Sequence, residues 1–276
     1  MTLEAKPFNA PLGAEVMGVD LTKPMTPAVA NELRAAWLKY QVLVIRGQQI
    51  SVDDQRRFVN CFGELQQPRG RLSSVNPDIL YVANVAVEDQ PGDQEGEMHF
   101  HADQCYYETP TAGAVLYGMD IPSKGGNTRF ANMYMAYETL PAHLRSKLEG
   151  RDILFTYDYA NNATKRADID PSKFPNYIHP AVIAHPQTGR PVLFVNRLMA
   201  HSIVGLSKSE SDQLLDEVFA HIENTGVYEH VWKKHDILLW DNFSTLHART
   251  DFDPSEKRVL RRMGIRGQKP SGYAPN

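Results

Sequence analysis

The chain of 276 residues is 42% apolar with a net charge of −4, which fits one large domain with a substantial core and excludes a basic nucleic-acid-binding surface. No apolar run approaches the roughly 20 residues that span a bilayer, and residues 1–7 hold no signal-peptide core, so we expect a cytoplasmic protein with no membrane partner. With only Cys61 and Cys105, neither a disulfide framework nor a cysteine-based zinc site is predicted.

The first third of the chain is predicted to be an α+β scaffold. Thr26 and Pro27 suit the start of a helix, as a capping residue followed by a first-turn proline. The run 41–45 is largely β-branched and predicts a buried strand. Ser51 with Asp54 marks the start of a second helix. A loop rich in turn-forming residues should then surround one short strand at 79–82.

The middle of the chain is predicted to alternate strands with one long polar segment. Residues 97–103 should form a strand, residues 112–119 a core strand, and residues 125–128 a tight turn into another strand. A helical pair is expected over 134–148, interrupted by a proline. Residues 157–180 are polar and show little periodicity, so we expect a loop that closes over a substrate.

The last third is predicted to hold one amphipathic helix among strands. Ser207 with Glu210 forms a capping box ahead of this helix, which should end at Gly226. Strands are expected over 182–186, 191–196, 236–240 and 259–265. Many short strands with a few peripheral helices predict a single domain over residues 1–276, mainly β, with a double-stranded β-helix (jelly-roll) core.

The stretch His101-Ala102-Asp103 has the spacing of half a metal site. In a strand, residues two apart point to the same side, so the imidazole and the carboxylate should share a face. Two groups do not hold a first-row metal tightly, and the best third ligand is His247 in a distant predicted strand. Two histidines and one carboxylate are typical of non-haem Fe(II) oxygenases, because the open side must take a chelating cosubstrate and dioxygen.

Two arginines follow His247 in the last predicted strand. Arg258 and Arg262 are four residues apart, so in an extended strand they share a face. Guanidinium groups that point into a barrel need anions, and a dicarboxylate cosubstrate would supply one through paired hydrogen bonds. The hydroxyl of Thr128 could share that carboxylate with Arg258. Exposed arginines, and a threonine present for its β propensity, are the alternative interpretation.

These residues belong to a longer pattern that resembles the taurine dioxygenase and 2,4-dichlorophenoxyacetate dioxygenase (TauD/TfdA) family of Fe(II)/2-oxoglutarate-dependent dioxygenases. The resemblance covers nearly the whole chain, and so many motifs in order are specific for the family. The matching segments are Gly18-Val19-Asp20-Leu21, Phe62-Gly63-Glu64-Leu65, His101-Ala102-Asp103 with Glu108-Thr109-Pro110, Gly125-Gly126-Asn127-Thr128, His179-Pro180, His185-Pro186, Gly189-Arg190, Leu193-Phe194-Val195-Asn196, and Trp240-Asp241-Asn242 ahead of His247.

The resemblance implies an activity and a set of site residues. His101, Asp103 and His247 are similar to the Fe(II) ligands, while Thr128 and Arg258 are similar to the residues that hold the distal carboxylate of 2-oxoglutarate. Such an enzyme uses O2 and 2-oxoglutarate to hydroxylate an aliphatic carbon, gives succinate and CO2, and can cleave the hydroxylated product. The retained carboxylate at the second ligand position favours hydroxylation over halogenation. The resemblance also implies a homo-oligomer, a dimer or a tetramer.

The resemblance leaves the substrate open. Arg262 is similar to an arginine near the cosubstrate that, in the taurine enzyme, meets the substrate sulfonate. Residues 67–72 lack the histidine that binds taurine, so taurine itself is not expected, and the substrate should be another small organic acid, such as a sulfonate or a phenoxy acid. Tentative substrate residues are Glu97 and His99, which should share a strand face with His101 and Asp103, together with Gln104, Tyr106, Met199 and Arg71 or Arg69.

Two other functions use the same three metal ligands. The first is a non-catalytic, regulatory metal-binding jelly roll, although such a protein would have no need of an arginine for a dicarboxylate. The second is a zinc hydrolase, which the ligand chemistry allows. No residue stands out as its general base, and it should work anaerobically without 2-oxoglutarate.

Overall fold

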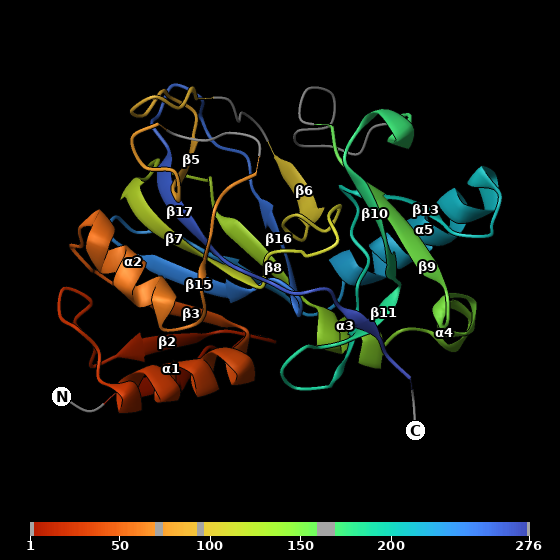
Figure 1. Ribbon diagram of the computed structural model, residues 1–276, viewed down its shortest axis with the longest axis horizontal. Coiled ribbons are helices and arrows are strands. Elements are labelled where there is room, and N and C mark those ends of the chain that lie inside the picture. Colours follow the sequence, from red (N-terminus) through yellow and green to blue (C-terminus); the bar gives the residue numbers. More distant parts are fainter. Residues whose placement is uncertain (1–2, 70–73, 93–96, 159–168, 275–276) are drawn as a thin grey trace.

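The computed structural model describes residues 3–69, 74–92, 97–158 and 169–274, and two facing sheets lie at its centre (Figure 1). The larger sheet has the order β1-β2-β3-β15-β7-β17-β4, with β5 paired to β17. The smaller sheet has the order β14-β8-β16-β6. The strands of the larger sheet are β1 (Glu4–Pro7), β2 (Ala14–Met17), β3 (Val42–Ile45), β4 (Leu65–Gln66), β5 (Leu80–Ala83), β7 (Gly113–Asp120), β15 (Ile237–Asp241) and β17 (Val259–Ile265). Those of the smaller sheet are β6 (Met98–His101), β8 (Thr128–Asn132), β14 (Val227–His230) and β16 (Thr245–Arg249).

Side-chain alternation along β3 explains how the layers stack. Val42 and Val44 join an apolar cluster between the two sheets, which also takes Phe130 from β8. Leu43 and Ile45 point to the opposite face and join a cluster beneath the helices α1 (Pro27–Tyr40) and α2 (Val52–Asn60). Because both faces of the strand are buried, its sequence is a continuous apolar run instead of an alternating one.

A third apolar cluster lies beyond the smaller sheet. It is covered by α3 (Met133–Glu138), α4 (Ala142–Leu148) and α5 (Lys208–Glu223). Two three-stranded sheets complete this side, with the orders β10-β9-β13 and β12-β11-β18. Their strands are β9 (Asp152–Thr156), β10 (Asn176–Pro180), β11 (Val182–Ala184), β12 (Pro191–Leu193), β13 (Ala200–Ile203) and β18 (Ser271–Gly272).

The helix starts follow the capping signals in the sequence. The Thr26 hydroxyl accepts a hydrogen bond from the backbone of Val29, and capping boxes are present at Ser51 and at Ser207. The last helix, α5, ends at Glu223, three residues earlier than expected. Among the residues described, no helix is both long enough and apolar enough to cross a membrane.

The long polar segment 157–180 differs from the prediction of a continuous loop. Its end forms β10, which pairs antiparallel with β9. This strand lies at the edge of its sheet and leaves Ile178 47% exposed, so its side chains lack the buried apolar face that identifies a strand in a sequence. Residues 159–168, where the predicted closing loop falls, lie outside the described residues.

Candidate metal centre and its cavity

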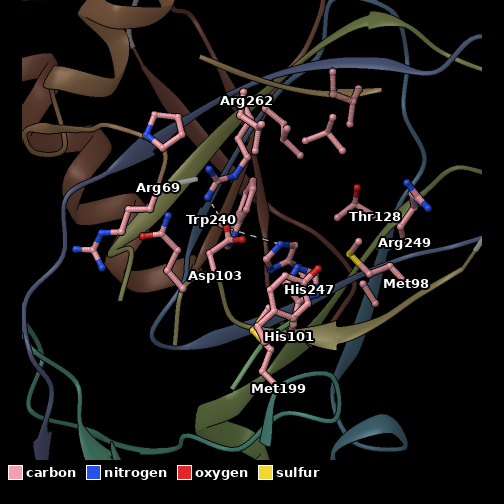
Figure 2. Close-up of a pocket in the computed structure, with 18 of the residues that line it drawn as sticks. Arg69, Met98, His101, Asp103, Thr128, Met199, Trp240, His247, Arg249 and Arg262 are labelled. Carbon is pink, nitrogen blue, oxygen red and sulfur yellow. Dashed lines mark hydrogen bonds and ion pairs between the residues drawn. The ribbon is translucent and has the colours of Figure 1, made fainter. Parts of the chain in front are cut away.

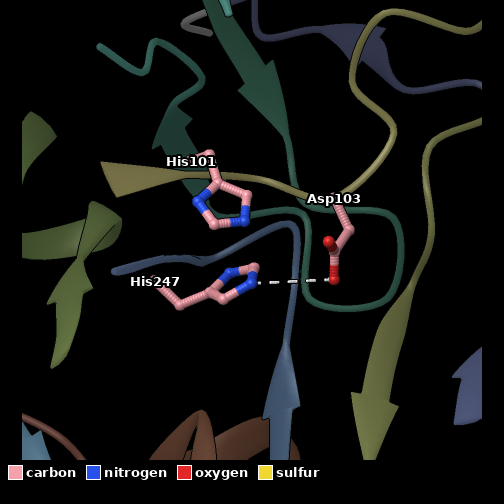
Figure 3. A group of neighbouring side chains, drawn as sticks. All are labelled: His101, Asp103 and His247. Atoms are coloured by element: carbon pink, nitrogen blue, oxygen red, sulfur yellow. Dashed lines mark ion pairs between the residues drawn. The ribbon is translucent and has the colours of Figure 1, made fainter. Parts of the chain in front are cut away.

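His101, Asp103 and His247 converge on one point beside the smaller sheet (Figure 3). His101 ends β6 and is the direct cross-strand partner of His247 on β16. One ligand atom from each of the three residues lies within 4.8 Å of the other two, and His247 Nε2 is 3.8 Å from Asp103 Oδ2. Two donors about 2.1 Å from one ion are at most about 4.2 Å apart, so the 3.8 Å between His247 Nε2 and Asp103 Oδ2 allows both atoms to bind one first-row metal.

Asp103 lies in a turn beyond β6, whereas the sequence analysis placed it in the strand. The side chain of Asn242, in the turn between β15 and β16, holds the backbone of Asp103. Asn242 Oδ1 accepts from the Asp103 amide at 2.7 Å, and Nδ2 donates to the carbonyls of Asp103 and Thr111 at 3.0 and 2.8 Å. Gln104 follows with a left-handed φ of 58°, which turns the chain sharply after the carboxylate.

The charges at the centre favour an ionised carboxylate and neutral imidazoles. Burial alone would raise the pKa of Asp103, but the charge of Arg262 and its hydrogen bond to the carboxylate hold this pKa below its usual range. Arg262 Nη2 donates to Asp103 Oδ2 at 2.7 Å. Burial lowers the pKa of His101, and it lowers that of His247 to about 3. Neutral imidazoles offer a nitrogen lone pair, as a metal requires.

A hydrogen bond selects the metal-facing nitrogen of His101. His101 Nδ1 lies 3.0 Å from the backbone carbonyl of His99. A carbonyl can only accept, so the ring hydrogen belongs on Nδ1 and the lone pair on Nε2. This arrangement fixes the ring and directs Nε2 as a ligand.

The first part of β6 faces differently from what the sequence predicted. His247 pairs with His101 but Arg249 pairs with Met98, so β6 has one extra residue, a β-bulge. The bulge reverses the alternation, and Met98 lines the cavity in place of His99. Glu97 is exposed and also lies outside the cavity lining. The prediction that Glu97 and His99 share a face with His101 and Asp103 is therefore wrong.

A cavity extends from the three ligands between the two sheets (Figure 2). Its lining includes Thr128 and Arg258, the pair suggested by the sequence for a carboxylate. Arg258 is 2% exposed, and its Nε donates to the carbonyl of Gly126 at 2.9 Å. Gly126 has a φ of 63°, and a Cβ there would come within 3.0 Å of the Arg258 side chain, so glycine is needed in this turn.

The part of the cavity around Arg258 is suited to an anion. Arg258 Nη1 is buried without a hydrogen-bond partner among the described residues. Burial, followed by the charge of Arg249, lowers the pKa of Arg258 to about 9, which still leaves the guanidinium charged at neutral pH. A buried cation without an anion is costly. A small molecule with two acid groups could satisfy Arg258 with one and reach a metal with the other, so the residues fit both a metal and a dicarboxylate.

Three of the tentative substrate residues line the same cavity, namely Gln104, Tyr106 and Met199. Gln104 Oε1 accepts a 2.6 Å hydrogen bond from Gln66, and the Tyr106 ring lies 5.3 Å from that of Tyr157. Arg69 also lines the cavity, although its guanidinium lies over the Tyr107 ring and donates to Thr109. Arg71 lies outside the described residues.

Sequence reasoning missed Arg249, which is 6% exposed and lines the cavity near Thr128 (Figure 2). It follows His247 by two residues in β16, and residues two apart in a strand point to the same side. The spacing could therefore have predicted that Arg249 faces the cavity. Trp240 was noted only as part of a motif, but its ring lies 4.8 Å from that of His247. An aromatic ring at that distance restricts the orientation of the imidazole.

Comparisons with known proteins agree with this site. Residues 4–263 match the family described as taurine catabolism dioxygenase TauD, TfdA family. A (S)-phenoxypropionate/alpha-ketoglutarate-dioxygenase of Sphingobium herbicidovorans is 34% identical, over 97% of this chain and 96% of the relative. The structure of a putative alpha-ketoglutarate-dependent taurine dioxygenase from Burkholderia xenovorans matches with a TM-score of 0.83 and 30% identity, covering 98% of this chain and 95% of that chain. The structure of AAD-2 in complex with Mn(II) and N-oxalylglycine matches with a TM-score of 0.82 and 28% identity, covering 98% and 100% of the two chains. The predicted jelly-roll core is confirmed by these structural matches.

Proposed function

The chain belongs to the taurine catabolism dioxygenase TauD, TfdA family, and from this we propose that it is an Fe(II)- and 2-oxoglutarate-dependent dioxygenase that hydroxylates an aliphatic carbon of a small organic acid. 2-Oxoglutarate is the alpha-ketoglutarate of the relatives' names. The observation that carries the proposal is one cavity that joins His101, Asp103 and His247 to the buried Arg258. A metal-binding jelly roll without catalysis has no use for that arginine, and among the described residues none stands out as the general base that a hydrolase would need.

Two separate groups of residues would bind the metal and the cosubstrate. His101, His247 and Asp103 would hold Fe(II) and leave open the side that faces the cavity. Arg258 and Thr128 would bind the distal carboxylate of 2-oxoglutarate. When bound, iron and 2-oxoglutarate supply the oxidising chemistry, in which O2 is reduced as 2-oxoglutarate becomes succinate and CO2. Arg262 keeps Asp103 ionised and oriented through their 2.7 Å contact.

The lining near Asp103 supports an acid with an apolar body as substrate. Tyr106, Tyr157 and Met199 supply an aromatic and apolar wall that excludes water from the reacting carbon. Gln104 and Arg69 supply hydrogen-bond donors for an acid group on the same side. We therefore place phenoxy acids first among the substrate classes, ahead of alkyl sulfonates. The resemblance alone suggests a homo-oligomer, a dimer or a tetramer, and light scattering on the purified protein would measure its mass.

Succinate formation tests the proposed function. Protein loaded with Fe(II) under anaerobic conditions receives 2-oxoglutarate, O2 and one acid from a panel of phenoxy acids, sulfonates and sulfate esters. We expect succinate to rise with at least one panel member, in equal amount with the hydroxylated or cleaved product. Absence of binding of either Fe(II) or 2-oxoglutarate, measured by calorimetry under nitrogen, would refute the proposal. Product formed anaerobically without 2-oxoglutarate would instead identify a hydrolase.

Replacing Asn242 with alanine should weaken metal binding although Asn242 is not a ligand. The substitution removes the three hydrogen bonds that hold the backbone at Asp103 and Thr111. Outer residues that orient metal ligands contribute roughly 10- to 100-fold to metal affinity. We expect the Kd for Mn(II), measured calorimetrically, to rise by about tenfold or more.

Asn132→Ala is the matched control for this prediction. Asn132 is also buried and makes three side-chain hydrogen bonds to backbone groups, at Pro11, Tyr134 and Met135. None of these groups belongs to a metal ligand. Both variants should lower the melting temperature, but only Asn242→Ala should change the Mn(II) affinity. Equal affinities in the two variants would contradict the positioning role of Asn242.

A further inference from the structure

We propose that Trp232 is a positioning residue for the cosubstrate, because its indole fixes the Thr128 hydroxyl as a hydrogen-bond donor toward the cavity. The inference rests on the proposed function, since it concerns the cosubstrate of that same site. Trp232 follows β14, and the last residue of β14, His230, is the cross-strand partner of Thr128 on β8. Trp232 Nε1 donates to Thr128 Oγ1 at 2.9 Å, and both residues are buried.

The chemistry of the two groups determines the direction of the hydrogen bond. An indole N–H can only donate, so it must occupy a lone pair of the Thr128 oxygen. A hydroxyl has one hydrogen, and that hydrogen must then point away from the indole. Among the described residues, no protein acceptor takes the Thr128 hydrogen, and Thr128 lines the cavity. A carboxylate in the cavity is therefore the acceptor that this geometry selects.

The bond from Trp232 should also make Thr128 a stronger donor. A hydroxyl that accepts a hydrogen bond is polarised and donates its own hydrogen more strongly. The carboxylate would then be held by the Thr128 hydroxyl and by Nη1 of Arg258, which has no partner in the described part of the chain and lines the same cavity. One donor is neutral and the other charged, so loss of the first should weaken binding without abolishing it.

A buried polar network keeps the indole in place. The Trp232 ring packs edge-on against the His230 ring, with centroids 4.7 Å apart and planes at 88°. His230 Nε2 lies 3.5 Å from Asp236, whose carboxylate also accepts from the Lys233 amide and from Arg46. These contacts hold the His230 ring against the indole. The N–H of Trp232 is thus directed at Thr128 before any ligand binds.

The test compares four variants of the full chain by calorimetric binding of N-oxalylglycine in the presence of Mn(II). Trp232→Phe keeps the aromatic packing and removes the N–H, and we expect the Kd to rise by roughly three- to tenfold, because the Thr128 hydroxyl is then no longer fixed and polarised as a donor. Trp37→Phe is the matched control, because the buried Trp37 N–H has no hydrogen-bond partner among the described residues. Its Kd should stay within about twofold of the wild type. Thr128→Val should weaken binding by a similar or larger factor, and the double variant Trp232→Phe/Thr128→Val should match Thr128→Val alone.

The outcomes separate this inference from the proposed function. If the wild-type protein does not bind N-oxalylglycine, the proposed function is refuted and the inference with it. If the wild type binds and Thr128→Val is weakened while Trp232→Phe is not, only the inference is overturned. Fully additive effects in the double variant would also overturn it, because Trp232 would then act independently of Thr128.

A second measurement does not depend on the folding of Trp232→Phe. The protein has three tryptophans, so its indole N–H signals can be resolved by NMR in protein labelled with ¹⁵N and bound to diamagnetic Zn(II). The N–H signal of Trp232 should move in Thr128→Val, which removes its acceptor, and should move again when N-oxalylglycine binds the wild type. The Trp37 signal should move in neither case. An unchanged Trp232 signal on binding would overturn the inference.

Discussion

Replacing Asp103 with alanine should abolish metal-dependent succinate formation. The substitution removes one of three ligands and the only anion among them, so Mn(II) affinity should fall by more than the roughly 100-fold that outer residues can contribute. Activity should fall to the background of metal-free protein. Calorimetry with Mn(II) and succinate analysis with Fe(II) measure the two effects separately.

Two further variants control for indirect effects at Asp103. Asp103→Asn keeps the size of the side chain and removes its charge. If Asp103→Asn and Asp103→Ala both lose Mn(II) affinity, the loss is due to the missing charge and not to a cavity left by the smaller side chain. Asp152→Ala removes an exposed carboxylate at the start of β9 and should bind metal like the wild type. Retention of wild-type Mn(II) affinity in Asp103→Ala, with a normal melting temperature, would show that the three side chains are not the metal site.

Replacing Arg258 with methionine should weaken the binding of 2-oxoglutarate without destabilising the fold. When the cavity holds no ligand, the buried guanidinium has no anionic partner among the residues that the structure describes. Burying an unpaired charge destabilises the folded state, and methionine removes that charge. The melting temperature without cosubstrate should therefore stay the same or rise. The KM for 2-oxoglutarate should rise by about 100-fold, because one partner of a buried charge pair is lost.

The apparent affinity for metal provides the internal control for Arg258. This residue does not contact His101, Asp103 or His247, so Mn(II) binding without cosubstrate should be unchanged in Arg258→Met. A fall in melting temperature together with an unchanged KM would contradict the role of Arg258 and would indicate a structural one. Addition of 2-oxoglutarate with Mn(II) should raise the melting temperature of the wild type more than that of the variant.

The sequence predicted the chemistry of the site more completely than its geometry. The ligand triad could be proposed because a His and an Asp two residues apart form a local pattern, and Arg258 because it lies four residues before Arg262, next to a predicted strand. Capping boxes at Ser51 and Ser207 predicted the starts of their helices, since a cap involves residues only three apart.

Features that depend on contacts between distant strands were not predictable. The bulge in β6 is defined by its pairing with β16, which is distant in the chain. The residues of β6 alone therefore do not indicate that Met98, and not His99, lines the cavity. The hydrogen bond from Trp232 to Thr128 joins β8 to the segment that follows β14, 104 residues further along the chain, and a tryptophan in a sequence indicates only an apolar residue. The strand β10 was missed because an edge strand need not bury a regular face.

The cross-strand pairing of His101 with His247 has a consequence for how the chain folds. β6 (Met98–His101) is an edge strand of four residues, and the partner that holds it in the sheet, β16 (Thr245–Arg249), lies far along the chain. Closing so long a loop is entropically costly and slows folding, so this pairing should form late. A bound metal would link the two strands only after the rest of the sheet has assembled. Metal should therefore slow unfolding strongly while leaving the refolding rate almost unchanged.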